Sequence, residues 1–213
     1  MKTAQQGEYM EKRNKRIFMA FIGVCMSGFS VGLFKMSLFG TDPFQCLVSG
    51  IWNLIQMNFG TLYTILNLIM LVGVYFLDKR YIGVATFINI FGTGYIVQFT
   101  TNLLEPLLGN SSLAVRIVLL ITGIIIMCFA SAFYYTANLG VSTYDAVALI
   151  LADKKVAKFQ YCRIGTDLIC ILIGFLFHAV VGVGTVVTAF FMGPLIELFN
   201  VHAARPFLKG KAA

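Results

Sequence analysis

The sequence has few charged residues and only two histidines. Asp, Glu, Lys and Arg make up 12% of its 213 residues, whereas 59% are hydrophobic. No soluble domain of this length needs so much apolar surface, so the composition places the chain among the polytopic membrane proteins. His178 and His202 lie far apart in the sequence and predict no metal site. We therefore expect no metal and no cofactor.

Paired cysteines and catalytic motifs are also missing. The five cysteines are an odd number, form no C-x-x-C motif and lie within apolar runs. This pattern excludes a disulfide framework and indicates small buried side chains. The sequence has no Gly-rich phosphate loop, no HExxH and no GxSxG. Since each motif supplies groups that its chemistry requires, we do not expect an enzyme.

The charge that is present is basic and lies at the edges of apolar runs. The net charge is +7, and Lys and Arg cluster within 12–16, 79–80, 154–158 and 205–211. Such a distribution is typical of topology signals and of contacts with anionic lipid. The lipid bilayer is therefore an expected partner, and nucleic acid is not.

Six apolar stretches are long enough to cross a bilayer, which takes about 20 residues. They are 17–39, 60–77, 81–104, 115–138, 159–178 and 181–201. Two shorter helical stretches remain, 43–57 and 143–152. The second offers only about nine helical residues before the lysines, which rise about 14 Å, half of the hydrocarbon core. We expect both to enter the membrane without crossing it, although 43–57 also fits a short true span.

The basic residues select between two topologies. If neither short stretch crosses, all four basic clusters lie on one side of the membrane, together with both termini. If both cross, Lys79 and Arg80 move to the other side. The positive-inside rule favours the first arrangement. The sequence therefore predicts an all-α polytopic protein with six transmembrane helices, two short half-helices and cytoplasmic termini.

The sequence repeats after about one hundred residues. The matching pairs include Arg16 and Arg116, Gly23 and Gly123, Phe29 and Phe129, Gly40 and Gly140, and Phe59 and Phe159; one further residue of shift matches Gly83 with Gly184 and Gly92 with Gly193. Because each half holds three spans, an odd number, the copies must have opposite orientations, which gives an inverted 3+3 repeat. We divide the chain into a cytoplasmic basic segment (1–16), a first membrane repeat (17–104), an extracytoplasmic linker (105–114), a second repeat (115–201) and a cytoplasmic basic tail (202–213).

Each copy contains a break with helix-capping residues, in the stretches GTDPFQC and GVSTYDA. Gly40 and Gly140 are predicted to end the preceding helix in the left-handed conformation. Asp42 and Ser142 follow as N-cap candidates of the next helix, with Pro43 at a position where its missing N–H has no consequence.

The third residues of the two short helices, Gln45 and Asp145, occupy the reciprocal position of a capping box. A helix that starts within a bilayer has N–H groups and a positive dipole end that lipid cannot satisfy. Two such starts, brought in from opposite faces, would point to one central cavity suited to an anion or the polar end of a zwitterion. Asp42 and Asp145 favour instead a cationic group or a proton. A purely structural role as helix ends stays open.

Polar residues recur at one depth in two predicted spans. Arg163 and Asp167 lie four apart, the spacing of an intrahelical ion pair, and ionisable residues within spans are candidates for function. Tyr63 and Asn67 occupy the equivalent places in the other half, and Asn89 lies at a similar depth. We expect these side chains to bind a solute, with a structural ion pair as the alternative.

Glu197 follows Gly193 and Pro194 in the last predicted span. A Gly-Pro pair inside a span predicts a kink or an unwound turn that needs a polar partner. Glu197 also lies close to the inner end, which fits a role at the surface.

Five stretches are similar to those of a known family. They are GTDPFQCLVSGI, FGTLYTILNLIML, LGVSTYDAVALIL, CRIGTDLICILIG and GVGTVVTAFFMGPLIELF. They resemble the YczE/YitT-like small bacterial membrane proteins over residues 17–200. Gln45 stands where the first copy in that family usually has an acidic residue. The resemblance implies a multi-pass protein of the bacterial plasma membrane.

These patterns predict a transporter, or permease, for a small polar or charged solute that binds near the midplane between the repeats. The predicted binding residues are Asp167, Arg163, Asn67, Tyr63, Asn89, Asp145, Asp42, Gln45, Ser142 and Glu197. A passive channel and a non-transporting accessory or scaffold protein are the alternatives. Besides the solute and the bilayer, a homodimer or a membrane-protein partner is left open.

Overall fold

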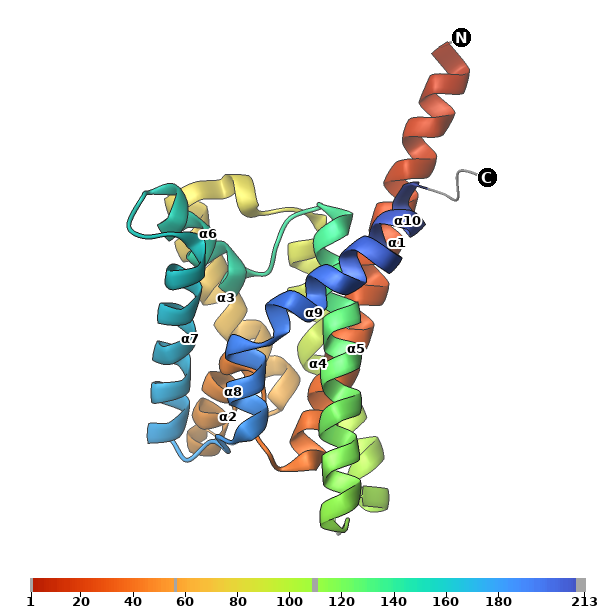
Figure 1. Cartoon of the computed structure of the whole chain (residues 1–213). Helices are drawn as coiled ribbons and strands as arrows, with labels where there is room; N and C mark the ends of the chain where they lie inside the picture. The colour runs from red at the N-terminus through yellow and green to blue at the C-terminus, as the bar shows by residue number, and fades with distance from the viewer. Residues whose placement is uncertain (1, 56, 109–110, 210–213) are drawn as a thin grey trace.

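The computed structural model describes residues 2–55, 57–108 and 111–209, and within these ranges it is helical without a β-strand. The α-helices are α1 (Lys2–Ser37), α2 (Pro43–Ile55), α3 (Phe59–Asp78), α4 (Val84–Leu108), α5 (Leu113–Ala137), α6 (Thr143–Asp153), α7 (Phe159–Leu176), α8 (Val183–Phe190), α9 (Met192–Phe199) and α10 (Arg205–Lys209) (Figure 1). A 3₁₀ turn (Lys79–Tyr81) follows α3, and a π-helical turn (Asn200–Ala204) precedes α10. The all-α prediction is confirmed.

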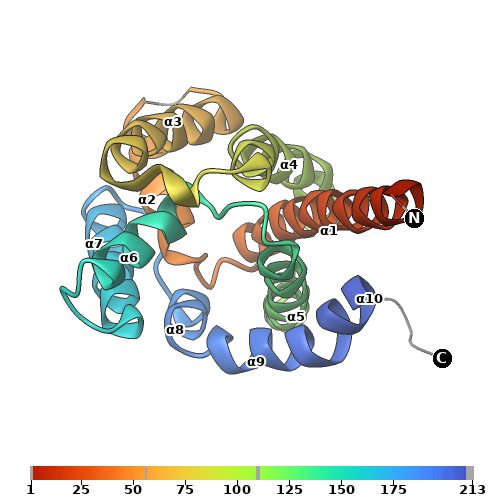
Figure 2. The same ribbon diagram turned by 90° about the horizontal axis from the view of Figure 1, so that it is seen from above.

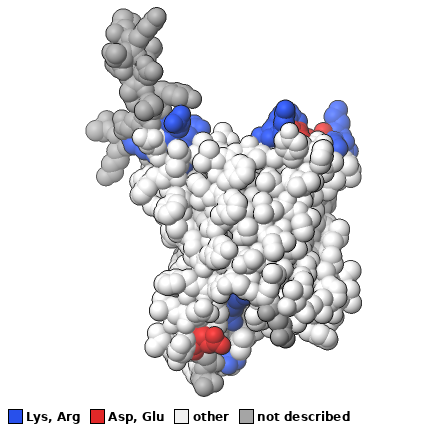
Figure 3. Space-filling view, turned by 180° about the vertical axis from the view of Figure 1, so that it is seen from behind, with Lys and Arg blue, Asp and Glu red and all other residues white. Residues whose placement is uncertain are grey.

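Among the described residues, three helical stretches are long and apolar enough to cross a membrane: Arg13–Ser37, Phe59–Tyr81 and Leu113–Ala137. A fourth is present if Val183–Phe190 and Met192–Leu208, bent by 58° at their junction, count as one broken span. Large apolar side chains such as Phe76 are exposed on the surface. Figure 3 shows Lys and Arg gathered at the end where the N-terminus lies, above a broad zone with few charged atoms in this view. These features support insertion into a membrane.

The long helices surround a centre, and the short helices α2 and α6 begin near this centre (Figure 2). α1 packs against α4 and α5, α2 against α7, and α6 against α3 and α7. Figure 1 places α6 near the end where the N-terminus lies and α2 near the opposite end. The short helices thus occupy opposite ends of the molecule.

Glycines allow α1 and α5 to approach closely. A Cβ on Gly23 would lie 2.9 Å from the Ala130 carbonyl oxygen, and one on Gly123 would lie 2.7 Å from the ring of Phe34. The Ser30 hydroxyl donates a hydrogen bond to the Gly123 carbonyl oxygen at 2.6 Å. Small residues at such crossings are typical of helix packing in membranes.

The helix bounds differ from the predicted ranges at three places. α1 continues through the described part of the predicted basic segment 1–16, and α4 reaches Leu108, inside the predicted linker 105–114. The last predicted span, 181–201, breaks at Phe191 rather than at its Gly-Pro pair. Pro194 lies in the first turn of α9, where its missing N–H leaves no helical hydrogen bond unmade, so the break precedes it.

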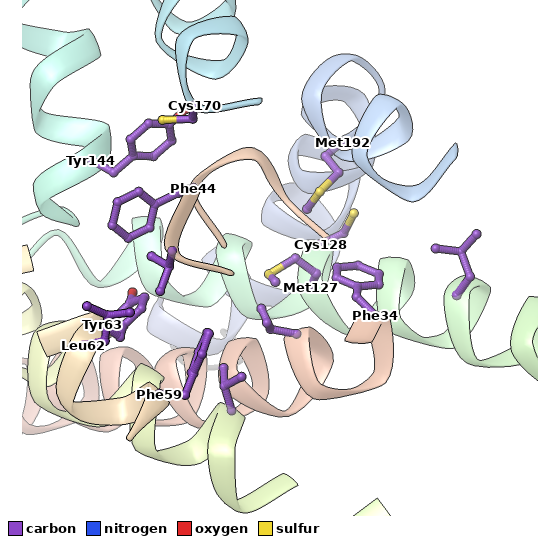
Figure 4. Packing of buried hydrophobic residues seen from close by; sticks show 14 residues of the cluster. Phe34, Phe44, Phe59, Leu62, Tyr63, Met127, Cys128, Tyr144, Cys170 and Met192 are labelled. Carbon is purple, nitrogen blue, oxygen red and sulfur yellow. The ribbon is translucent and has the colours of Figure 1, made fainter. Parts of the chain in front are cut away.

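The largest buried apolar cluster packs around the start of α2 (Figure 4). We call it the apolar plug; its buried members are Val31, Phe34, Phe44, Val48, Phe59, Leu62, Tyr63, Val97, Leu120, Met127, Cys128, Tyr144, Cys170 and Met192. All five cysteines are free thiols.

Candidate functional site

The helices line a cavity of about 770 Å³ that is open on one part of its wall. Its wall is formed by α1, α3, α4, α5, α7, α8 and α9 together with the starts of α2 and α6. All ten residues predicted to bind a solute line it: Asp42, Gln45, Tyr63, Asn67, Asn89, Ser142, Asp145, Arg163, Asp167 and Glu197. The structure thus brings them together from six helices and the segments between them, while their binding role stays a prediction.

Both short helices begin at the cavity with the caps that the sequence predicts. The Gln45 backbone N–H donates to Asp42 Oδ1, and the Asp145 N–H donates to the Ser142 hydroxyl, each at 3.1 Å. Each cap satisfies one of the free N–H groups of its helix start. The prediction of Asp42 and Ser142 as N-caps is confirmed.

The reciprocal half of the predicted capping boxes does not form. The side-chain oxygen of Gln45 has no hydrogen-bond partner. Asp145 instead bonds to Arg163 and accepts a hydrogen bond from the Tyr135 hydroxyl at 3.1 Å. The prediction is wrong here because both side chains line the cavity and do not fold back onto their helix starts.

The left-handed residues that end α1 and α5 are Leu38 and Asn138, with φ of 59° and 49°. The prediction that Gly40 and Gly140 end these helices is therefore wrong, since each helix stops two residues earlier. The glycines still take φ of 94° and 102°, which favours glycine. A Cβ on Gly140 would lie 2.5 Å from the Gly83 nitrogen, so a close backbone approach adds to this requirement.

Arg163 joins two carboxylates in the cavity wall. It is bonded to Asp145, and its Nε lies 3.3 Å from Asp167 Oδ1 in the predicted i,i+4 pair. The Tyr144 hydroxyl donates to Asp167, and the guanidinium carbon lies 4.6 Å from the centre of the Tyr144 ring. Charge-assisted hydrogen bonds of this kind hold side chains in defined positions.

The equivalent position in the first half is neutral. Asn67 donates from its amide to the Tyr63 carbonyl at 2.8 Å and accepts from the Thr143 hydroxyl at 2.6 Å. The Tyr63 hydroxyl donates to Asn89 Oδ1 at 3.2 Å. Asn67 thereby ties α3 to the start of α6, next to the ionic group.

Carboxylates outnumber cations in the wall. Asp42, Asp145 and Asp167 face one guanidinium, that of Arg163, so two negative charges are in excess when all are ionised. Glu197 lies at the rim, where Arg205 balances it at 3.1 Å. The cavity is therefore acidic.

Apart from Tyr63, the aromatic residues of the cavity wall were not predicted from the sequence. The rings of Phe44 and Tyr144 stack with centroids 5.2 Å apart, and Tyr63 meets Phe44 edge-on at 5.7 Å. Tyr134 and Tyr135 also line the cavity. The available signal was the place of Phe44 and Tyr144 at equivalent positions in the two short helices, beside the polar residues already selected.

Comparison with known proteins gives a family without an assigned role. Residues 14–201 match a family of unknown function (DUF6198), and the chain belongs to this family. An uncharacterized protein of Haemophilus influenzae is 28% identical over 198 residues, which cover 91% of this chain and 88% of that protein. The uncharacterized protein YyaS of Bacillus subtilis is 21% identical over 187 residues, covering 88% and 93%. No solved structure matches. The YczE/YitT-like resemblance stays a prediction.

Proposed function

We propose that the protein is a permease for a small polar or charged solute, which binds in the cavity between two inverted repeats. The observation that carries the proposal is that two capped short helices begin at one cavity lined by charged and amide side chains. Discontinuous helices whose starts point to a central site are the usual construction of solute sites in transporters.

The lengths of the short helices support six passes with two half-helices. α2 has 13 residues and α6 has 11. At 1.5 Å per residue they rise about 20 and 17 Å, well below the roughly 30 Å of a hydrocarbon core. In this arrangement α4 and α7 cross with the three long apolar helices and the broken span, and every basic cluster lies at the cytoplasmic end of a bacterial plasma membrane.

Reciprocal contacts support the inverted repeat. Gly23 faces Tyr134 across the α1–α5 crossing, and Gly123 faces Phe34. Each of these residues corresponds to another of the four at a shift of one hundred, so the two contacts are exchanged copies of each other. Such exchange is expected of a two-fold axis within the chain.

Backbone hydrogen bonds at the two breaks show the same exchange between the two halves of the chain. The Ala85 N–H donates to the Leu139 carbonyl at 2.9 Å, and the Gly184 N–H donates to the Phe39 carbonyl at 2.8 Å. These bonds relate Ala85 to Gly184, a shift of 99 rather than the 101 used for the sequence alignment in this region. Each break is thus held by the start of the third span of the other half.

A carrier fits the cavity better than an open channel. The apolar plug forms its floor, since Val31, Phe44 and Tyr63 belong to both. At the opposite end the rim residues Phe159 and Glu197 are exposed. Because one end is closed by packed side chains and the other reaches the surface, transport requires a conformational change. A scaffold protein has no need of a charged interior cavity.

Uptake by liposomes tests the proposal. The purified full-length chain is reconstituted and offered labelled amino acids, amines, nucleosides and organic acids. We expect saturable uptake of one class, lost in Asp167→Asn and Arg163→Gln and retained in Glu105→Gln, an exposed acidic residue outside the cavity. Uptake without saturation would favour the channel, and the absence of uptake for all classes would contradict the permease.

A further inference from the structure

One carboxylate of the cavity has no cation of its own. Arg163 is bonded to Asp145 and Asp167, which use its guanidinium. In the described part of the chain, no ion pair includes Asp42, although Asp42 lies close enough to Arg163 and Asp167 for their charges to interact. An unpaired carboxylate at membrane depth is unfavourable unless a cation or a proton meets it.

The groups that attract an anion are already used by the protein. One N–H group at the start of each short helix, that of Gln45 and that of Asp145, is bonded to the cap residue, Asp42 or Ser142. Arg163, the one cation among the cavity-lining residues, lies between two carboxylates. An added anion would therefore meet excess negative charge and no available cation in the wall.

The polar atoms that remain unused can accept hydrogen bonds. Gln45 Oε1, Thr93 Oγ1 and the Tyr134 hydroxyl are buried in the cavity wall without a partner, and these residues are 3%, 2% and 6% exposed. An amide oxygen only accepts, and hydroxyls accept as well as donate. Buried polar atoms are normally paired, so Gln45 Oε1 points to a ligand that brings a hydrogen-bond donor, and the two hydroxyls can accept from the same ligand.

The remaining wall suits an organic molecule. Phe44, Tyr63, Tyr134 and Tyr144 line the cavity, and ring faces attract organic cations. A volume of about 770 Å³ is in the range of small-molecule sites. A bare metal ion would leave most of this space and the rings unused.

We propose that the solute is an organic cation whose ammonium or guanidinium group binds at Asp42 and Gln45, with the aromatic rings around its apolar part. The cation supplies the N–H donors that these acceptors lack, and it balances the excess negative charge of the wall. This inference rests on the proposed function only in taking the cavity as a solute site.

Equilibrium binding of matched probes tests the proposal without any transport step. The full-length chain in nanodiscs is titrated with n-butylammonium, n-butanol, butyrate, tetramethylammonium and sodium chloride, and thermal unfolding reports binding. We expect n-butylammonium to raise the unfolding temperature. Tetramethylammonium, which has the charge without N–H donors, should bind more weakly, and n-butanol, butyrate and sodium should not bind.

Two variants locate the binding group. Asp42→Asn and Gln45→Met should each weaken n-butylammonium binding, by about 10- to 100-fold for the loss of the charged acceptor. Glu105→Gln, which changes an exposed carboxylate outside the cavity, should bind as the wild type does. The probe series on the wild-type chain is decisive even where a variant does not fold.

Several results would overturn the inference. They are equal binding of butanol or butyrate, a response to sodium alone, or no response to n-butylammonium up to about 10 mM, above the usual range of substrate affinities. Saturable liposome uptake of an anion without cation binding would sink this inference and leave the permease standing. Cation binding without any uptake would support this inference and contradict the permease.

Discussion

The two short helices begin with equivalent caps in different surroundings. At the start of α2, Phe44 and Gln45 are buried, and Phe59 behind them is 5% exposed. At the start of α6, Arg163 lies in the wall of the cavity, and Phe159, the counterpart of Phe59 one hundred residues later, is 46% exposed. Both starts are buried, since Phe44 and Tyr144 belong to the apolar plug. The difference lies beside them, where Phe59 is packed into the plug and Phe159 is exposed.

The two helix starts also differ in the third residue of each short helix. Asp145 is a carboxylate and has Arg163 as its cation, whereas Gln45 is neutral and its amide oxygen has no partner. Ionised groups at membrane depth need a partner or access to water. The ionic residues of the site, Asp145 and Arg163, therefore lie at the open end of the cavity. We call them the ionic half; the neutral half, which contains Gln45 and Asn67, lies at the closed end.

The largest expected effect on the free energy of unfolding comes from removing Arg163, the cation of the ionic half. Arg163→Leu leaves Asp145 and Asp167 unpaired, and breaking a buried ion pair costs about 3–5 kcal/mol. Because the Arg163 side chain is 30% exposed, we expect the lower end, about 3 kcal/mol. Unfolding in mixed detergent micelles measures it.

A matched arginine serves as the control for this variant. Arg80→Gln removes the exposed partner of Asp78 and should leave the unfolding midpoint almost unchanged. Adding Asp145→Asn to Arg163→Leu should restore part of the loss. Equal effects of the two arginine variants would contradict the importance of the ionic group.

A smaller effect is expected where the two halves cross. Gly23→Val places a side chain against the Ala130 carbonyl and Tyr134, and overpacking of this kind costs about 1–3 kcal/mol. Gly165→Ala is the control, since nothing lies within 4 Å of its Cβ position. The unfolding midpoints of the two variants give the difference. A tolerated Gly23→Val would show that the close crossing is dispensable.

The smallest effect on the free energy of unfolding is expected from losing the hydrogen bond between Asn67 of α3 and Thr143 of α6. Thr143→Val removes the donor to Asn67 Oδ1, at a cost of about 1 kcal/mol. Thr143→Ser keeps the hydroxyl and should retain most of this stability. If valine and serine give the same unfolding midpoint, the bond does not tie the two halves.

Local features of the site could be predicted from the sequence. Capping by Asp42 and Ser142 depends on residues three positions apart, and the Arg163–Asp167 pair depends on one helical turn, so both follow from spacing alone. The short length of α6 follows from the lysines that interrupt its apolar run.

Features that depend on packing between helices could not be predicted. The bond from Arg163 to Asp145 crosses from α7 to α6, and no spacing rule selects it. The helix ends at Leu38 and Asn138 depend on how each break meets the other half of the chain. A glycine pattern gives the places where the backbone is unusual, and tertiary contacts decide which residue ends the helix.

Cysteine accessibility in intact cells tests most directly whether the short helices fail to cross the membrane. In a variant without the five native cysteines, single cysteines replace the exposed residues Asn53, Lys79, Ser112 and Lys154. With two half-helices, an impermeant thiol reagent labels positions 53 and 112 from outside, and positions 79 and 154 only after lysis. Labelling of position 79 from outside would mean that α2 crosses the bilayer, and it would contradict the shared cavity of two half-helices.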